Sequence, residues 1–338
     1  MRVLIIGGTR FMGPGIVARL ACEGHEVTVF HRGKTTAELP EGVQEVLGDR
    51  NRLGDFLDDI RRLRPDIVVD MMLLSENQAS QLIAVMTGVA ARLVVASSCD
   101  VYFQYDLLRG IEHGPSGEGR VDESSPLRRN LFPYRDSVPG ASHELFEYDK
   151  ILVERTVMSS AALPATVLRL PMVYGPGDYQ HRFYGWVKRI LDGRPAIILE
   201  NGQAEWRITR GYDDNCAVAI CRAVTDERGA GRVYNVGEPA APTERDWIKR
   251  IAAKLEWPGK VVTVAAGALP ETMRSGLDWQ HSLIVDTGRI RNELGFAEPV
   301  DPDTCLSKTI AWERDNPPQS YNDPFHYTAE DRILKAAL

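Results

Sequence analysis

A glycine-rich segment near the N-terminus carries the clearest chemical signal of the chain. It runs Gly-Gly-Thr-Arg-Phe-Met-Gly from Gly7 to Gly13, after an apolar run at residues 3–6 and before a helix-forming stretch at residues 16–21. A strand that turns on glycines into a helix directs bare N–H groups and the positive end of the helix dipole at one point, which suits a pyrophosphate. The segment predicts a dinucleotide-binding α/β domain and a redox cofactor.

Positive charges near this segment bear on which dinucleotide is bound. Arg10 stands where the usual pattern has a second glycine, and His31, Arg32 and Lys34 follow a predicted strand at residues 26–30. An NAD site commonly has an acid at the end of this strand for the ribose 2′-hydroxyl, whereas Arg32 and Lys34 would attract a 2′-phosphate. We predict NADP, with NAD as the alternative. Arginine and lysine side chains that merely face solvent would give the same sequence pattern.

Alternating strands and helices are expected to position these residues. Near-continuous apolar strands separated by helices imply a parallel sheet covered on both faces. We therefore predict an α/β fold, a Rossmann doubly wound parallel sheet with a smaller mixed α/β C-terminal substrate lobe. The strands are expected at residues 3–6, 26–30, 43–47, 66–70, 92–98 and 165–170, and helices between them at 16–21, 53–63, 77–87 and 142–160.

The sequence pattern also predicts how the chain divides into domains. Residues 1–172 are expected to form the dinucleotide-binding Rossmann domain, to which the chain returns around 207–237. Residues 173–206 and 238–338 are expected to form the smaller substrate-binding lobe. A polar stretch from 103 to 140 interrupts the strand–helix rhythm, and a loop of this length is typical of a lid that shapes a pocket. The lobe's helices are expected at 182–192, 216–225, 244–255 and 302–314.

Composition excludes several classes of protein. The 338 residues carry a formal net charge of −7, which gives no general attraction to nucleic acid or to an anionic membrane. No apolar run approaches the ~18 residues of a transmembrane helix, and the first strand starts directly after Arg2, so we expect a cytoplasmic protein. The odd number of cysteines, without a C-x-x-C pair, favours reduced thiols over disulfides or a metal site. These are Cys22, Cys99, Cys216, Cys221 and Cys305.

Further motifs follow in an order that resembles a known family. After the glycine loop come Gly48-Asp49-Arg50, Ser-Ser-Cys-Asp-Val-Tyr at 97–102, a lysine helix with Lys150 and Glu154, Leu-Arg at 168–169, Val-Tyr-Gly-Pro-Gly at 173–177 and Val-Tyr-Asn-Val-Gly at 233–237. Together they resemble the extended short-chain dehydrogenases/reductases, and among them the NAD-dependent epimerase/dehydratase family. The form of the glycine loop resembles a subgroup that includes RNA-binding chloroplast proteins and many bacterial proteins.

The resemblance implies a set of cofactor contacts. Gly7 permits the tight turn, Gly13 lets the helix pack closely, and Asp49 matches the residue that accepts from the adenine amino group. A turn-forming aspartate is the alternative for Asp49. The residues expected to bind the cofactor are Gly7, Thr9, Arg10, Phe11, Met12, Gly13, His31, Arg32, Lys34, Asp49, Arg50, Met71 and Lys150.

The resemblance also implies a catalytic group, from which this chain departs. The family uses a hydroxyl, here Ser98, and a tyrosine four residues before the lysine, here Lys150; that position is Phe146, which cannot exchange a proton. Tyr148 lies only two residues before Lys150, about 200° away on an ideal helix. It can serve as the acid/base only if the helix begins late or the local turn is irregular. The alternatives are Tyr102, Tyr134, His143, a group on the substrate, or lost catalysis.

On the substrate side, the family commonly acts on nucleotide-linked sugars and holds the diphosphate with arginines. Arg207 resembles one such arginine, and Arg274 is a second candidate; a solvated arginine is the alternative for Arg207. The expected substrate-binding residues are Ser98, Tyr102, Tyr134, Arg207 and Arg274.

The predicted function is an NAD(P)-dependent epimerase, dehydratase or reductase that acts on a polar small molecule. The alternative is a catalytically altered dinucleotide-binding protein that serves as an RNA-binding or regulatory module, although the net charge of −7 makes a nucleic-acid partner unfavourable. No metal is expected. By resemblance alone, a homodimer is expected through helices that include the lysine helix.

Overall fold

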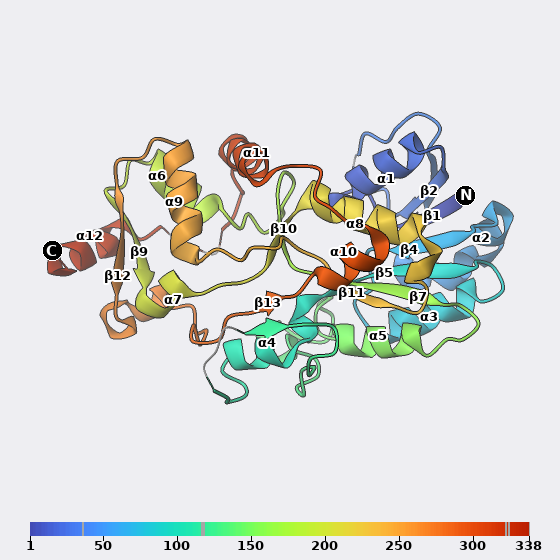
Figure 1. The fold of residues 1–338 in the computed structure, drawn as a ribbon, viewed down its shortest axis with the longest axis horizontal. Helices are drawn as coiled ribbons and strands as arrows, with labels where there is room; N and C mark the ends of the chain where they lie inside the picture. Colours follow the sequence, from blue (N-terminus) through green and yellow to red (C-terminus); the bar gives the residue numbers. More distant parts are fainter. Residues whose placement is uncertain (36, 116–118, 322, 324, 338) are drawn as a thin grey trace.

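A parallel sheet of seven strands forms one end of the molecule (Figure 1). The computed structural model describes residues 1–35, 37–115, 119–321, 323 and 325–337. The strand order is β11-β7-β5-β4-β1-β2-β3, which confirms the predicted α/β Rossmann fold. The strands are β1 (Arg2–Ile6), β2 (Glu26–His31), β3 (Gln44–Leu47), β4 (Ile67–Asp70), β5 (Arg92–Ser98), β7 (Ala165–Leu170) and β11 (Val233–Asn235).

Helices cover both faces of this sheet because its strands are apolar on both sides. Along β1, Val3 and Ile5 enter one buried cluster while Leu4 and Ile6 enter the other. Helices α1 (Met12–Cys22), α8 (Asp213–Thr225) and α10 (Gly288–Leu294) contribute to the first cluster. Helices α2 (Leu57–Leu63), α3 (Glu76–Met86) and α5 (Lys150–Met158) contribute to the second.

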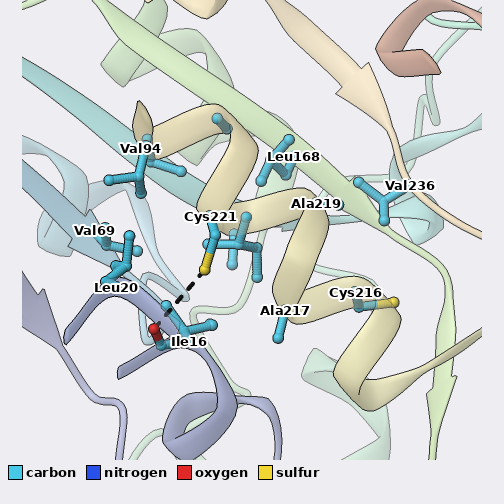
Figure 2. Packing of buried hydrophobic residues seen from close by; sticks show 14 of the residues in the cluster. Ile16, Leu20, Val69, Val94, Leu168, Cys216, Ala217, Ala219, Cys221 and Val236 are labelled. Atoms are coloured by element: carbon cyan, nitrogen blue, oxygen red, sulfur yellow. Dashed lines mark hydrogen bonds between the residues drawn. The ribbon is translucent and has the colours of Figure 1, made fainter. Parts of the chain in front are cut away.

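Helix α8 shows how a distant segment completes the first face. Figure 2 shows α8 packed on the strands beside Val94 and Leu168, with Cys221 directed at α1. The Cys221 thiol donates to the Ile16 carbonyl oxygen at 3.8 Å. All five cysteines are free.

The smaller lobe lies at the other end of the molecule and has its own core (Figure 1). Trp247, Tyr174 and Phe183 are fully buried at its centre. The chain leaves the main sheet after β7 and returns to it at β11. The domain boundaries expected from the sequence stay a prediction. The elements are β8 (Met172–Tyr174), α6 (Tyr184–Leu191), β9 (Ala196–Glu200), α7 (Asn201–Glu205), β10 (Arg210–Tyr212), α9 (Glu244–Lys254), β12 (Lys260–Val264), α11 (Pro302–Asp315) and α12 (Tyr327–Ala337).

The polar stretch from 103 to 140 is more regular than a loop. It contains α4 (Phe103–Leu108) and β6 (Arg120–Val121), which pairs in parallel with β13 (Ile284–Val285). Residues 116–118 lie outside the described part. The predicted helix at 53–63 begins as a 3₁₀ segment. The 3₁₀ helices are η1 (Arg50–Phe56), η2 (Cys99–Val101), η3 (Arg135–Ser137), η4 (Glu227–Gly229), η5 (Ala266–Ala268) and η6 (Glu271–Met273).

The prediction of a helix at residues 142–160 was wrong about where the helix begins. Helix α5 begins at Lys150, because Asp149 caps it by accepting from the N–H groups of Ile151 and Leu152 at 2.8 and 3.2 Å. Asp149 also accepts from the backbone N–H of Phe132 at 2.7 Å, which ties the helix start to the 103–140 stretch. Residues 141–148 therefore run as turns.

Candidate functional site

The turn from β1 into α1 has the shape of a phosphate cradle. Gly7 and Gly8 have φ values of 99° and 87°, a region in which a side chain is strained. A Cβ on Gly13 would lie 2.4 Å from the Gly8 carbonyl carbon, so only glycine lets α1 pack this closely. The start of a helix lacks intrahelical partners for its first N–H groups. The segment thus fits the pyrophosphate of a dinucleotide, with Thr9, Phe11 and Met12 half-buried along it.

The basic residues predicted near the adenosine come from two neighbouring segments. The Arg10 Nε donates to Thr35 Oγ1 at 2.8 Å, so Arg10 reaches the turn that carries Arg32 and Lys34. Arg10, Arg32 and Lys34 are all exposed. His31 instead shapes the turn, since its Nε2 lies 2.7 Å from a Glu45 carboxylate oxygen. Its Nδ1 accepts from the Gly33 N–H at 3.3 Å.

Two of the expected cofactor residues have structural partners. Asp49 is exposed and accepts from the Asn51 N–H at 2.9 Å, as in the turn-forming alternative. Arg50 is buried and its Nη2 donates to Asp70 at 2.8 Å and to the Gln78 carbonyl oxygen at 3.0 Å. Arg50 thus braces the carboxyl end of β4. Its Nε and Nη1 have no hydrogen-bond partner among the described residues, and its cofactor role stays a prediction.

Met71 forms part of the wall behind the glycine loop. It follows β4, and its N–H donates to the Ile6 carbonyl oxygen at 3.0 Å. A Cβ on Gly7 would lie 3.4 Å from Met71 Cβ and 3.0 Å from Met72 Cγ. Larger side chains at Gly7 would therefore displace this wall.

Ser98, Tyr148 and Lys150 come together at the carboxyl end of β5. Tyr148 Oη donates to Asp100 Oδ2 at 2.8 Å, and the Asp100 N–H donates to Ser98 Oγ at 3.2 Å. Lys150 Nζ lies 5.8 Å from the centre of the Tyr148 ring. Because α5 begins only at Lys150, Tyr148 precedes the helix and its side chain does not follow helical spacing. The late helix start that Tyr148 needs to act as the acid/base is therefore present. The catalytic role of Tyr148 stays a prediction.

Phe146 lies apart from this group. Its ring is half-buried under the Arg135 guanidinium, whose central carbon lies 4.9 Å from the ring centre. The Arg135 Nε also donates to the Phe146 carbonyl oxygen at 3.3 Å. The residue at the family's tyrosine position thus takes a structural role against Arg135.

Lys150 is buried at the ends of two strands. Its Nζ donates to the carbonyl oxygens of Leu73 at 2.6 Å and Ala96 at 2.8 Å. Among the described residues these two acceptors leave one of its three N–H donors for a ligand. Burial lowers the pKa of Lys150 to about 8, although the charges of Asp100 and Asp70 oppose this shift.

Asp100 is a site residue that the sequence analysis did not single out. It is 5% exposed and accepts from both Tyr148 and Tyr134, the latter at 3.2 Å. In the sequence, only its position in the 97–102 motif could have pointed to Asp100 as a site residue. Tyr134 adds a bond of 2.9 Å to Tyr105, and its ring centre lies 5.1 Å from that of Tyr148. Tyr134 thus lies beside Tyr148, and its expected substrate-binding role stays a prediction.

Tyr102 is placed differently from the substrate role expected for it. It is fully buried, and its hydroxyl donates to Asn235 Oδ1 at 2.6 Å and accepts from Arg169 Nη1 at 3.0 Å. Arg169 in turn pairs with the buried Glu154 at 2.7 Å. These contacts make Tyr102 part of the core beneath the site, because its only polar atom is already engaged.

A basic cavity of about 310 Å³ opens between α9 of the smaller lobe and the paired strands β6 and β13. Arg207 lines it, held by bonds from its backbone N to Ser282 Oγ at 3.1 Å and from the Leu283 N–H to its carbonyl oxygen at 3.0 Å. Arg274 does not line it; its Nε donates to the Leu269 carbonyl oxygen at 3.0 Å. Arg120 and Arg250, which were not among the substrate ligands expected from the sequence, add two further positive charges to the cavity. The lining residues are Arg120, Arg207, Pro239, Ala240, Ala241, Pro242, Asp246, Arg250 and Ile284.

The described residues contain neither a membrane-spanning helix nor a cluster of metal ligands. None of their helices is long and apolar enough to cross a membrane. They also contain no group of three or more histidine, cysteine, aspartate or glutamate side chains placed to hold a metal ion.

Known proteins resemble the chain in sequence and in fold. The sequence profile of the NAD dependent epimerase/dehydratase family matches residues 3–237. A 2'-dehydrokanamycin reductase of Streptomyces kanamyceticus is 28% identical over 79% of this chain and 70% of its own length. A dTDP-glucose 4,6-dehydratase of Streptomyces griseus is 30% identical over 59% of this chain and 55% of its own. In fold, the UDP-glucose 4-epimerase of Thermotoga maritima aligns with a TM-score of 0.69 and 17% identity, over 93% of this chain and 99% of the other.

Proposed function

Because the chain belongs to the NAD dependent epimerase/dehydratase family, we propose that it oxidises a carbinol carbon, or reduces a carbonyl carbon, of a nucleotide-linked sugar with NADP as cofactor. The observation that carries this proposal is the convergence of Ser98, Tyr148 and Lys150 at the end of β5. A family profile and relatives that include sugar dehydratases and reductases support an NAD(P)-dependent enzyme.

The residues of the site divide the work of such a reaction. When bound, the nicotinamide supplies a hydride acceptor or donor for the carbon that bears the reacting oxygen. Ser98 Oγ orients that oxygen by a hydrogen bond, and Tyr148 Oη takes or returns its proton. Lys150 uses its remaining N–H to hold the ribose hydroxyls. The glycine loop and Arg10 bind the pyrophosphate.

Turnover of named substrates tests this function. The purified protein is incubated with UDP-glucose or dTDP-glucose and catalytic or stoichiometric NADP, and products are separated by mass and by chromatography of the isomers. We expect an isomerised, dehydrated or oxidised sugar from one of them. Absence of any cofactor binding by calorimetry would contradict the proposal for every substrate.

The choice of NADP is supported by the cations that Arg10 brings together with the β2 turn. We expect Arg32→Ala or Lys34→Ala to weaken NADP binding about tenfold, because a hydrogen bond to a charged phosphate is worth about 1.5–3 kcal/mol. Calorimetric titration measures this, with NAD as the internal control because it lacks the 2′-phosphate.

Lys335→Ala is the control for these variants because it removes a positive charge far from the expected cofactor site. Lys335 is exposed on α12, at the opposite end of the molecule from β2 (Figure 1). Its loss is expected to leave both affinities unchanged. Equal affinity of the wild-type protein for NAD and NADP would instead refute the preference.

The basic cavity supports a nucleoside diphosphate as the invariant part of the substrate. Its three arginines face one carboxylate, Asp246, which is already engaged with the Thr243 N–H at 3.3 Å. We expect Arg250→Ala to weaken UDP or dTDP binding about 10- to 100-fold, since charge-assisted bonds to phosphate are lost. Arg274→Ala is the control because Arg274 lies outside the cavity lining. An Arg250→Ala affinity equal to that of the control would remove the cavity from the substrate site.

The remaining partners follow the family resemblance. We propose a homodimer through helices that include α5, which sedimentation analysis tests. No feature of the described residues or of the family match favours the RNA-binding or regulatory alternative.

A further inference from the structure

We propose that Asp100 holds the proton behind Tyr148: as Tyr148 takes the proton of the substrate hydroxyl, it passes its own proton to Asp100. Asp100 thus acts through Tyr148 as a positioning and proton-holding residue. This inference rests on the proposed acid/base role of Tyr148 and extends it to a buried carboxylate.

Geometry supplies the path for this transfer. Tyr148 Oη donates directly to Asp100 Oδ2 at 2.8 Å. The same oxygen accepts from Tyr134 Oη at 3.2 Å, which in turn lies 2.9 Å from Tyr105 Oη. A continuous set of hydrogen bonds therefore joins the phenol at the centre to two further phenols, with the carboxylate between them.

The second carboxylate oxygen, Oδ1, favours protonation of Asp100. Asp100 Oδ1 is buried and has no hydrogen-bond partner among the described residues. The proton from Tyr148 bonds to Oδ2, the oxygen to which Tyr148 donates, and Oδ1 becomes the carbonyl oxygen of the neutral acid. A buried, unpaired oxygen costs less free energy as that carbonyl oxygen than as part of a carboxylate anion.

Charged and titratable groups face Asp100 from every element around it. Arg128 donates from Nε to the Asp100 carbonyl oxygen at 2.5 Å, and its charge acts on the carboxylate. Lys150 acts from the start of α5, and Cys99 is adjacent in the chain. The phenols are Tyr105 of α4, Tyr134 of the 103–140 stretch and Tyr148 before α5.

The surroundings raise the pKa values of both Asp100 and Tyr148. Burial raises the pKa of Asp100, although Arg128 and Tyr148 oppose the shift. Burial and the Asp100 charge raise the pKa of Tyr148 well above its ordinary value. A lysine alone would lower the phenol's pKa. Beside an ionised Asp100, Tyr148 instead stays a protonated phenol and has no free base form to take the substrate proton. Passing its proton to Asp100 removes this obstacle.

The step balances in atoms and electrons. In the oxidation direction the substrate O–H bond breaks and its proton bonds to Tyr148 Oη, while the Tyr148 O–H bond breaks and its proton bonds to Asp100. The electron pair of the substrate C–H bond leaves as hydride to the oxidised nicotinamide, and C–O becomes C=O. Reduction runs each transfer in reverse.

The pH profile of kcat/KM tests the relay in the oxidation direction. Asp100 must be ionised to accept the proton, so activity is lost as pH falls through its pKa. Tyr134→Phe removes a hydrogen bond that lowers this pKa, so the acid limb should move to higher pH. Tyr105→Phe, whose hydroxyl bonds Tyr134 but not Asp100, should move it less. A Tyr134→Phe profile identical to that of the wild type overturns the relay.

Replacing the carboxylate provides the second arm. Asp100→Asn should lower kcat about 10²-fold and abolish the acid limb, and Asp100→Glu should restore part of both. If Tyr148→Phe keeps full activity, the proposed role of Tyr148 itself fails. If Tyr148→Phe is inactive while Asp100→Asn keeps the wild-type rate and profile, only the relay fails.

A readout that needs no substrate accompanies these assays. Tyrosine labelled with ¹³C at Cζ reports phenol ionisation by NMR, and Tyr148→Phe assigns the signal. Asp100→Asn removes a negative charge beside the phenol, so the pKa of Tyr148 should fall. Tyr134→Phe keeps the profile test valid should Asp100→Asn not fold. An unchanged Tyr148 titration in folded Asp100→Asn contradicts the proposal.

Discussion

Tyr148→Phe is expected to lower kcat/KM about 10²- to 10⁴-fold, the usual contribution of a positioned general acid/base. The substitution removes only the hydroxyl that donates to Asp100, so the ring remains 5.1 Å from that of Tyr134. Steady-state kinetics with whichever nucleotide-linked sugar turns over measures the loss. Calorimetry should find cofactor affinity within a few-fold of the wild type, because Lys150 and the glycine loop are untouched.

Phe146→Tyr in the Tyr148→Phe background is the matched control. It restores a phenol at the position four residues before Lys150. We expect no rescue, since the Phe146 ring is held under Arg135 and precedes the start of α5. Recovery of activity in the double variant would show that the family position, and not Tyr148, meets the substrate.

Arg169→Met is expected to lower the free energy of unfolding by about 3–5 kcal/mol, the typical cost of leaving one partner of a buried ion pair uncompensated. Arg169 Nη2 lies 2.7 Å from Glu154, and both side chains are nearly inaccessible. The Glu154 carboxylate also accepts from Ser97 Oγ at 2.5 Å, which cannot replace the lost charge. Urea denaturation followed by circular dichroism measures the change.

Two comparisons make this stability test specific. Arg228→Ala breaks an exposed pair with Asp226 and should leave the urea midpoint unchanged, because water screens such pairs. The double variant Glu154→Gln with Arg169→Met should be more stable than Arg169→Met alone, since no buried charge is left unpaired. If Arg169→Met shifts the midpoint no more than Arg228→Ala, the buried network does not stabilise the fold.

Much of the main sheet could be predicted because its causes are local. Apolar runs such as residues 92–98 became strands with the predicted bounds, and the glycine turn into α1 follows from close packing at Gly13. The start of α5 was missed even though Asp149 is a good N-cap residue. Apolar spacing shows where a helix has a buried face but not where its first turn begins.

The unpredicted parts of the site depend on contacts between distant segments. Asp100 meets Tyr134 across 34 positions and Tyr148 across 48. Arg50 donates to Asp70, and Tyr102 donates to Asn235, again between segments that are far apart in the sequence. A single sequence marks such residues as polar but does not show which of them is already paired. Arg250 joins the cavity from α9 for the same reason.

A crystal structure with bound NADP and UDP-glucose or dTDP-glucose tests the central claim most directly. We expect the Tyr148 hydroxyl to lie within hydrogen-bonding distance of the reacting sugar oxygen, with Phe146 still against Arg135. A complex in which Tyr148 points away from the sugar and another proton donor occupies its place would contradict it.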